Sequence, residues 1–203
     1  MSYAAGTLEE GFSLVVATHI SLCDDCRARL ESYEAIGGSL VENTDAVEMT
    51  DDALEATFAL IDAAPEMRFY QRSAQNEGVF PTPLRSYVGG DLDAVNWRPA
   101  GGGVQQAVLK TEGGSKVRLL SIPGGTAMPD HGHRGLELTL VLKGAFEDED
   151  GLFSRGDVEV ANEELQHTPV AKVGEPCICL AATDAPLRFK GLIPRIAQPF
   201  LGI

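Results

Sequence analysis

The first part of the chain carries apolar residues at helical spacing. Leu8, Phe12 and Val15 lie at positions i, i+4 and i+7, and this periodicity predicts an amphipathic helix. We expect the helical segment to continue to about Ile36 and to end at Gly37-Gly38, because glycine commonly terminates helices.

A second helix is predicted between Thr50 and Pro65. Asp52 is followed three residues later by Glu55, which is the spacing of a capping box. Periodicity alone leaves open whether the apolar stripe of this helix packs within the protein or against a partner. The stripe consists of Leu54, Phe58 and Ile61.

After Tyr87 the pattern changes to short apolar or alternating runs, separated by turns that contain glycine or proline. Alternation places Glu137, Thr139 and Val141 on one face of a strand and the intervening leucines on the other. Many short strands with frequent turns predict a sandwich or a barrel. The predicted strands are Val104–Leu109, Lys116–Ile122, Leu136–Leu142, Ala145–Asp148, Asp157–Ala161, Cys177–Ala181 and Leu187–Phe189.

These patterns predict a multidomain protein. Residues 1–64 are expected to form a small all-α domain, and residues 86–203 an all-β domain. The residues between them, 65–85, lack periodicity for most of their length and contain Pro81-Thr-Pro83. We therefore interpret them as a linker.

Composition and charge exclude some classes of function for this chain. The chain has 44% hydrophobic and 23% charged residues, as in ordinary globular proteins. Its first 75 residues carry 14 acidic and 4 basic side chains, which is −10 of the total net charge of −14. Direct nucleic-acid binding is not expected, because it needs clustered Lys and Arg; a basic protein partner is compatible. No stretch reads as a signal peptide or a membrane span, so we expect a cytoplasmic protein without membrane contact.

The strongest candidate for chemistry is the segment Gly125–Glu137. His131 and His133 are two residues apart, so on a strand their imidazoles face the same side. Glu137 follows four residues later, and the next histidine along the chain is His167. Nitrogen and carboxylate ligands suit a first-row metal such as zinc, iron, manganese or nickel. The alternative is that the two histidines are surface loop residues.

This segment resembles the first cupin motif, whose fixed places are matched by Gly125, His131, His133, Glu137 and Gly144. Phe153–Asp157 and His167–Pro169 are similar to the core of the second motif, although the usual proline before the glycine is missing. The resemblance implies a jelly-roll barrel with a divalent metal in it, zinc before iron, manganese or nickel. The implied ligands are His131, His133, Glu137 and His167.

A second cluster of donors lies in the first helical segment. At 100° per residue, His19, Cys23 and Cys26 fall within about 60° on one face of a continuous helix. Thiolate and imidazole ligands at such spacing favour Zn2+. The alternative is a helix with two buried cysteines and a polar histidine.

The spacing His-x3-Cys-x2-Cys resembles the zinc-binding anti-sigma domain, which encloses and inhibits an extracytoplasmic-function sigma factor. The site of that family has a further histidine upstream, and none precedes His19 here. The fourth zinc ligand is therefore missing, so either the start codon is assigned too late or the site has three ligands. A degenerate anti-sigma factor that has lost tight inhibition is a further hypothesis.

A zinc anti-sigma domain followed by a cupin domain resembles the ChrR-type anti-sigma factors. The resemblance implies that residues 1–64 hold an extracytoplasmic-function sigma factor. It also implies that the cupin domain senses oxidative stress of the singlet-oxygen type and triggers release. On this interpretation the protein is a regulator and not an enzyme. The alternative is a cupin metalloenzyme, such as a dioxygenase, with a helical interaction domain.

Two further cysteines, Cys177 and Cys179, are two residues apart on a predicted strand and therefore share a face. They are either redox-active thiols near the metal or buried strand residues. A disulfide between such close neighbours on one extended strand would be strained.

Overall fold

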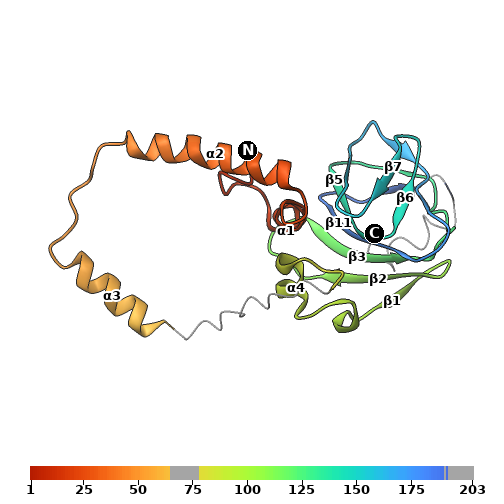
Figure 1. Ribbon diagram of the computed structural model, residues 1–203, viewed down its shortest axis with the longest axis horizontal. Helices are drawn as coiled ribbons and strands as arrows, with labels where there is room; N and C mark the ends of the chain where they lie inside the picture. The colour runs from red at the N-terminus through yellow and green to blue at the C-terminus, as the bar shows by residue number, and fades with distance from the viewer. Residues whose placement is uncertain (65–77, 190, 192–203) are drawn as a thin grey trace.

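The computed structural model describes residues 1–64, 78–189 and 191. Helices come first and strands follow, as the sequence predicts (Figure 1). The helices are α1 (Glu10–Ile20), α2 (Asp24–Glu42), α3 (Ala53–Ala63) and α4 (Thr82–Val88), followed by a 3-10 turn at Leu92–Ala94. The strands are β1 (Arg98–Gly101), β2 (Val104–Leu109), β3 (Lys116–Ile122), β4 (His131–Gly132), β5 (Glu137–Lys143), β6 (Ala145–Glu147), β7 (Leu152–Ser154), β8 (Val158–Ala161), β9 (Gln166–His167), β10 (Val170–Ala171), β11 (Cys177–Thr183) and β12 (Arg188–Phe189).

The strands form a barrel of antiparallel sheets. Its larger wall is six-stranded, in the order β1-β2-β3-β11-β5-β8. Two three-stranded sheets, β10-β6-β7 and β12-β4-β9, face the inner side of this wall. The central strand β11 is buried at every residue and pairs with β3 and β5. The predicted all-β jelly-roll domain is therefore confirmed.

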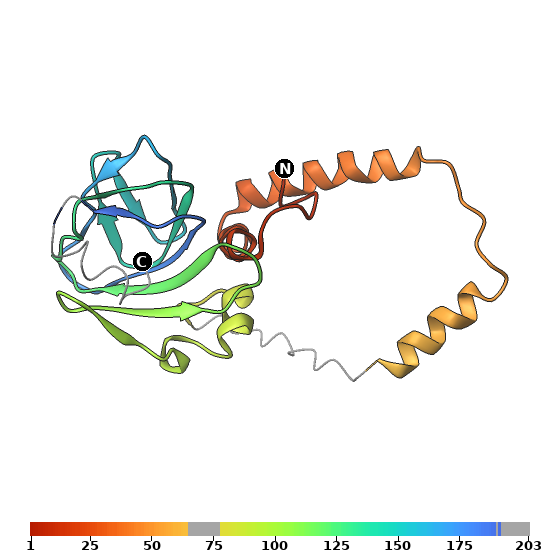
Figure 2. The same ribbon diagram turned by 180° about the vertical axis from the view of Figure 1, so that it is seen from behind.

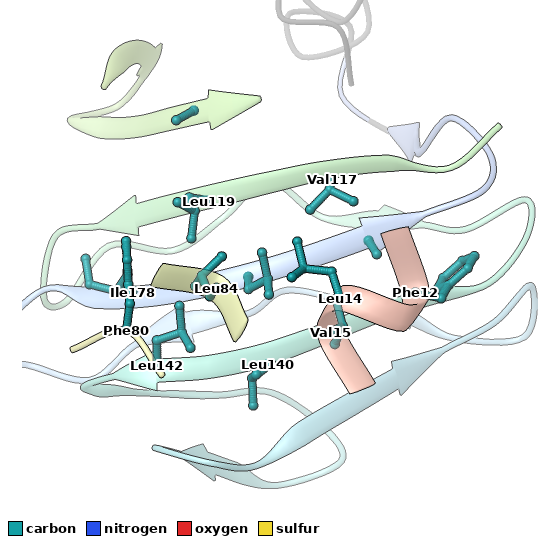
Figure 3. Packing of buried hydrophobic residues seen from close by; sticks show 13 residues of the cluster. Phe12, Leu14, Val15, Phe80, Leu84, Val117, Leu119, Leu140, Leu142 and Ile178 are labelled. Carbon is teal, nitrogen blue, oxygen red and sulfur yellow. The ribbon is translucent and has the colours of Figure 1, made fainter. Parts of the chain in front are cut away.

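The outer face of the large wall is covered by α1 and α4. Leu140 and Leu142 of β5 pack on this face, whereas Val141 belongs to the cluster inside the barrel, so the predicted alternation is confirmed. Figure 3 shows Val15 of α1 and Leu84 of α4 within this outer cluster. Neither side chain is exposed, so α1 is anchored to the barrel by burial of apolar surface.

We expect Val15→Ala to destabilise the barrel although Val15 lies in the predicted helical domain. The substitution removes two methyl groups from a fully buried site, which lowers the free energy of unfolding by roughly 1.5–3 kcal/mol. Chemical denaturation followed by the near-ultraviolet signal of the barrel measures this change. Val173→Ala is the matched control, because Val173 is 91% exposed, and an equal effect of the two substitutions would show that α1 is not part of the core.

The apolar core of the barrel includes residues from outside the predicted barrel domain, 86–203. α1 lies within residues 1–64 but packs in the same cluster as the barrel strands. Phe80 and Leu84, inside the predicted linker 65–85, are fully buried in that cluster. The stretch 78–85 therefore packs as part of the barrel domain, while residues 65–77 lie outside the described part of the chain.

The first helical segment differs from its prediction in two places. It is interrupted between Ile20 and Asp24, where Cys23 takes the N-cap position of α2. The two aspartates in the first turn of α2 stabilise a new helix start through the helix dipole. α2 then continues through Gly37-Gly38, because neither glycine adopts the left-handed conformation that ends a helix.

The predicted helix over residues 50–65 is confirmed as α3. Asp52 occupies its N-cap position, but the side chain makes no capping hydrogen bond, so the predicted capping box is not formed. Neither α2 nor α3 has a buried residue, and α3 lies away from the barrel (Figures 1 and 2). None of the helices in the described ranges is both long enough and apolar enough to cross a membrane.

Candidate metal centres and partner surface

Three histidine rings converge inside the barrel. Pairing of β4 with β9 places His131 opposite His167, and His133 follows two residues after His131. The Nε2 atom of His167 is 3.2 Å from that of His131 and 3.3 Å from that of His133. All three side chains are buried. The fold therefore brings these three predicted site residues together from two short strands and the residue that follows β4.

The remaining ring nitrogens of His131 and His167 are held by acceptors around the group, whereas Nδ1 of His133 makes no hydrogen bond. Nδ1 of His131 donates to the carbonyl of Pro129 at 2.8 Å. Nδ1 of His167 lies 2.7 Å from Oδ2 of Asp148 and 3.0 Å from Oε1 of Glu159. Contacts of this kind fix the ring orientation and make the opposite nitrogen a better metal ligand.

Burial and hydrogen bonding set the charge of the group. Burial lowers the pKa of His131 and of His133 to about 4, so both rings are neutral near pH 7. Burial acts in the same direction on His167, but hydrogen bonds to Glu159 and Asp148 outweigh it and raise its pKa to about 9. Burial also raises the pKa of Glu159 to about 7. His131 and His133 thus offer neutral nitrogen donors, whereas His167, held by the two carboxylates, carries a proton that a bound ion would have to displace.

A metal ion fits this arrangement. Because Nδ1 of His131 donates to a carbonyl, its Nε2 carries a lone pair directed toward the other two rings. Two nitrogens bound to zinc at about 2.0–2.1 Å in tetrahedral geometry are about 3.3–3.4 Å apart. The observed separations of 3.2 and 3.3 Å are close to that edge length. A cation between the three nitrogens would need only small side-chain movements.

Glu137, at the start of β5, lies beside the three histidines. Its Oε2 is 3.9 Å from Nδ1 of His133, and its Oε1 accepts a hydrogen bond from Thr139 at 3.1 Å. It lines the same cavity as His131 and His167, and burial raises the pKa of its carboxyl. The carboxylate stands outside the set of mutually close nitrogens, so its role as a ligand stays a prediction.

Asp148 and Glu159 are the residues of this site that sequence reasoning missed. Together with His167 they form a second group of close metal-ligand atoms. Glu159 is 4% exposed, whereas its neighbour Val160 is 62% exposed. A strand that buries a glutamate and exposes the adjacent valine reverses the usual preference for apolar residues inside. This reversal is the signal that could have indicated the site.

His19, Cys23 and Cys26 also come together, but across two helices. His19 is in the last turn of α1, Cys23 caps α2, and Cys26 lies in the first turn of α2. Their ligand atoms lie within 4.8 Å of one another, and the side chains are half-buried. The predicted single helical face was wrong, since the turn between the two helices makes the juxtaposition. Imidazole with two thiols is a donor set that suits zinc.

His19 also contacts the barrel. Its Nδ1 donates to the carbonyl of Gly156 at 2.8 Å, which leaves Nε2 with a lone pair for an ion. Gly156 follows β7 and has φ of +95°, a conformation that favours glycine. Three residues further along, Glu159 contacts His167. A short stretch of chain thus connects the helical donor group with the barrel group.

We expect Gly156→Ala to weaken zinc binding by the helical group. A Cβ at positive φ is strained and would displace the carbonyl that orients His19. Loss of such an outer partner typically reduces metal affinity about 10- to 100-fold. The measurement is chelator competition in a His133→Ala background, which removes a barrel ligand. Gly89→Ala is the matched control, because Gly89 has φ of +86° with nothing near its Cβ position; equal zinc affinities would refute the link.

The cysteine pair of β11 is part of the barrel interior. Cys177 and Cys179 are buried with their Sγ atoms 3.5 Å apart, and both thiols are free. The shared face is as predicted, and Cys179 lines the cavity beside the histidines. The hydrogen bond between them lowers the pKa of Cys177 and, with burial, raises that of Cys179.

Similarity to known proteins agrees with both halves of this structure. A family model described as the ChrR cupin-like domain matches residues 86–186. The anti-sigma-E factor ChrR of Cereibacter sphaeroides is 56% identical over 202 residues, covering 100% of this chain and 94% of that protein. The chain belongs to the ChrR family of anti-sigma factors.

A solved structure extends the ChrR-family match to three dimensions. The crystal structure of Rhodobacter sphaeroides SigE in complex with the anti-sigma ChrR is similar with a TM-score of 0.79 and 55% identity, over 90% of this chain and 93% of that chain. Membership in the ChrR family confirms the resemblance seen in the sequence. Family membership also favours the interpretation as a regulator over the alternative interpretation as a cupin metalloenzyme.

Proposed function

We propose that this chain captures an extracytoplasmic-function sigma factor with residues 24–63. The observation that carries the proposal is the apolar surface of α2, α3 and the segment between them. Four side chains of α3 are more than half exposed, namely Leu54, Phe58, Leu60 and Ile61. α2 and the following segment add Ile36, Leu40, Val41, Val47 and Met49. So many exposed apolar side chains on two helices and their connection indicate a surface that a protein partner covers.

Charge and similarity support the same partner. Acidic residues lie around the apolar positions, among them Glu48, Asp51 and Glu55, which suits a partner with basic surface around an apolar centre. The related ChrR was crystallised as a complex with SigE. We infer that the partner of this chain is a sigma factor of the same class. We also infer that the chain works in the cytoplasm and makes no direct contact with nucleic acid or membrane.

The metal sites complete the proposal. We assign Zn2+ to His19, Cys23 and Cys26, where it would hold the end of α1 against the start of α2. A divalent metal, with zinc favoured by the nitrogen spacing, would bind His131, His133 and His167, with Glu137 as the fourth ligand. On this proposal residues 24–63, within the predicted domain 1–64, contact the sigma factor, and residues 86–203 form the sensor.

We further propose that the barrel responds to oxidative stress of the singlet-oxygen type. The contact from His19 to Gly156 gives a change in the barrel a physical route to the helices. A signal shifts the equilibrium only if captured and released states interact differently with it. Illumination of the complex with a singlet-oxygen photosensitiser should release the sigma factor. Retention of the complex would remove the sensing part of the proposal and leave the capture part.

Calorimetric titration of the full chain with an extracytoplasmic-function sigma factor tests the proposed function. We expect one sigma factor per chain and an affinity that withstands moderate salt, because apolar burial dominates the contact. A sigma factor of the primary class serves as the control. Absence of heat and of co-elution with sigma factors of the first class would overturn the proposal.

A further inference from the structure

Two free thiols lie side by side in an apolar part of the barrel interior. The Sγ atoms of Cys177 and Cys179 are 3.5 Å apart. The other buried members of their cluster are apolar, among them Val104, Ile122 and Phe146. Within the described residues, neither cysteine belongs to a group of three or more mutually close His, Cys, Asp or Glu ligand atoms. The pair therefore suits a group that takes only two sulfur ligands.

The distance between the two sulfurs favours a bridge by a single pyramidal atom. A disulfide would need them at about 2.05 Å. An atom about 2.3 Å from each sulfur, the length of a zinc–thiolate bond, would have an S–X–S angle of about 100° at the observed 3.5 Å. A linear ion would need sulfurs about 4.6 Å apart and tetrahedral zinc about 3.8 Å. Trivalent arsenic has three bonds and a lone pair, so its bond angles are slightly below the tetrahedral value and match the pair.

A small reagent can reach this pair through the cavity of the barrel. Cys179 lines a cavity of about 370 Å3. Gly102, Ala127 and Pro129 line the same cavity and are exposed, so the cavity opens to solvent. At roughly 30 Å3 per water-sized group, it holds about a dozen non-hydrogen atoms. There is therefore room beside Cys179 for an arsenic atom with a substituent as large as a phenyl ring.

We propose that Cys177 and Cys179 capture a trivalent organoarsenical whose apolar substituent lies in the cavity. Such an arsonous acid carries one carbon substituent and two hydroxyl groups on arsenic. Each thiol forms one S–As bond, its proton leaves with one hydroxyl group as water, and arsenic stays trivalent. The product is uncharged, so its burial among apolar side chains carries no charge penalty. This capture goes beyond the proposed function, since it holds whether or not α2 and α3 bind a sigma factor.

Phenylarsine oxide, which hydrates to phenylarsonous acid in water, is the probe that tests the proposal. The full-length chain with Cys23→Ser and Cys26→Ser is the reference, because its remaining cysteines are Cys177 and Cys179. Cys23 stands at an N-cap position, where serine is favourable. Intact-mass spectrometry should show one phenylarsenic group per chain and no thiol left for alkylation by iodoacetamide. Excess 2-mercaptoethanol should leave the group in place, whereas 1,2-ethanedithiol, which also offers two sulfurs, should remove it.

Single-cysteine variants of this reference separate capture by the pair from capture by one thiol. Cys177→Ala and Cys179→Ala each leave one sulfur, and loss of the second point of attachment weakens binding at least about 100-fold. Both variants should therefore lose the phenylarsenic group to 2-mercaptoethanol. Met128→Leu is the matched control, because it removes from the same cluster a sulfur that has no proton to exchange, and it should capture the probe as the reference does. Thermal unfolding establishes that each variant is folded.

The number of thiols consumed decides the outcome. The proposal is overturned if the reference chain takes up no phenylarsenic group, or if one alkylatable thiol remains after the reaction. It is also overturned if 2-mercaptoethanol strips the reference as readily as the folded single-cysteine variants. The thiol count needs the reference chain alone, so it is decisive even if Cys177→Ala does not fold.

Discussion

Phe58→Asp combined with Ile61→Asp is expected to abolish capture of the sigma factor without unfolding the chain. The two side chains are 56% and 60% exposed, so the free chain loses little when they change. Burial of each in a complex contributes about 1.5–3 kcal/mol. Their joint loss corresponds to an affinity at least about 100-fold lower, and the introduced carboxylates lower it further. Titration calorimetry measures the affinity.

The control for this pair is Val160→Asp combined with Val173→Asp. These valines are 62% and 91% exposed but lie on the barrel. We expect the barrel variant to bind the sigma factor like the unmodified chain, and both variants to keep their free energy of unfolding within about 0.5 kcal/mol. Loss of binding by the barrel variant alone would place the capture surface on the barrel instead.

His133→Ala is expected to remove the metal of the barrel and to leave the metal of the helical group in place. His133 is 2% exposed, and its Nε2 is 3.3 Å from that of His167. A lost ligand costs more than the roughly 10- to 100-fold effect of an outer partner, so the barrel should lose its ion during purification. Elemental analysis of the purified chain gives the number of ions bound.

His19→Ala is the reciprocal variant and should lose the helical ion alone. The double variant His19→Ala with His133→Ala should bind neither ion. Loss of all metal in either single variant would mean that the two donor groups form one coupled site. An unchanged metal content in His133→Ala would contradict the assignment of the barrel centre.

The strand pattern of the barrel could be predicted because burial on one face dominates it. β2 and β3 coincide with their predicted bounds, and the other predicted strands lie within two residues of theirs. β11 is recognisable because it is apolar at nearly every position. β4, β9 and β10 have two residues each and are too short for a periodic signal. β4 and β9 nevertheless carry His131 and His167.

The helical part was harder to predict because local signals conflicted there. Pro81-Thr-Pro83 indicates a loop, but proline is also tolerated in the first turn of a helix, and α4 uses it in that way. Its seven residues place Leu84 in a core that only the tertiary structure reveals. The packing of α1 on the barrel likewise depends on residues far away in the sequence, such as Leu140.

The donor residues were recognisable from their spacing, whereas the groups that orient them were not. Three residues lie between His19 and Cys23 in the sequence whether one helix or two carry them, so spacing could not reveal the turn between the helices. Asp148 lies next to an exposed acidic turn, so its sequence context does not distinguish it from surface carboxylates. Its role is evident only from its contact with His167 in the folded chain. Glu159 interrupts an apolar run on a strand, and the fold explains that interruption by its contact with His167.

Hydrogen–deuterium exchange of the full chain, with and without an extracytoplasmic-function sigma factor, tests the capture surface most directly. Amide exchange slows where a segment is stabilised or covered. We predict slower exchange in α3 and in the second half of α2 when the sigma factor is bound, with β3, β5 and β11 unchanged. Protection confined to the barrel, with residues 24–63 exchanging as in the free chain, would contradict the account.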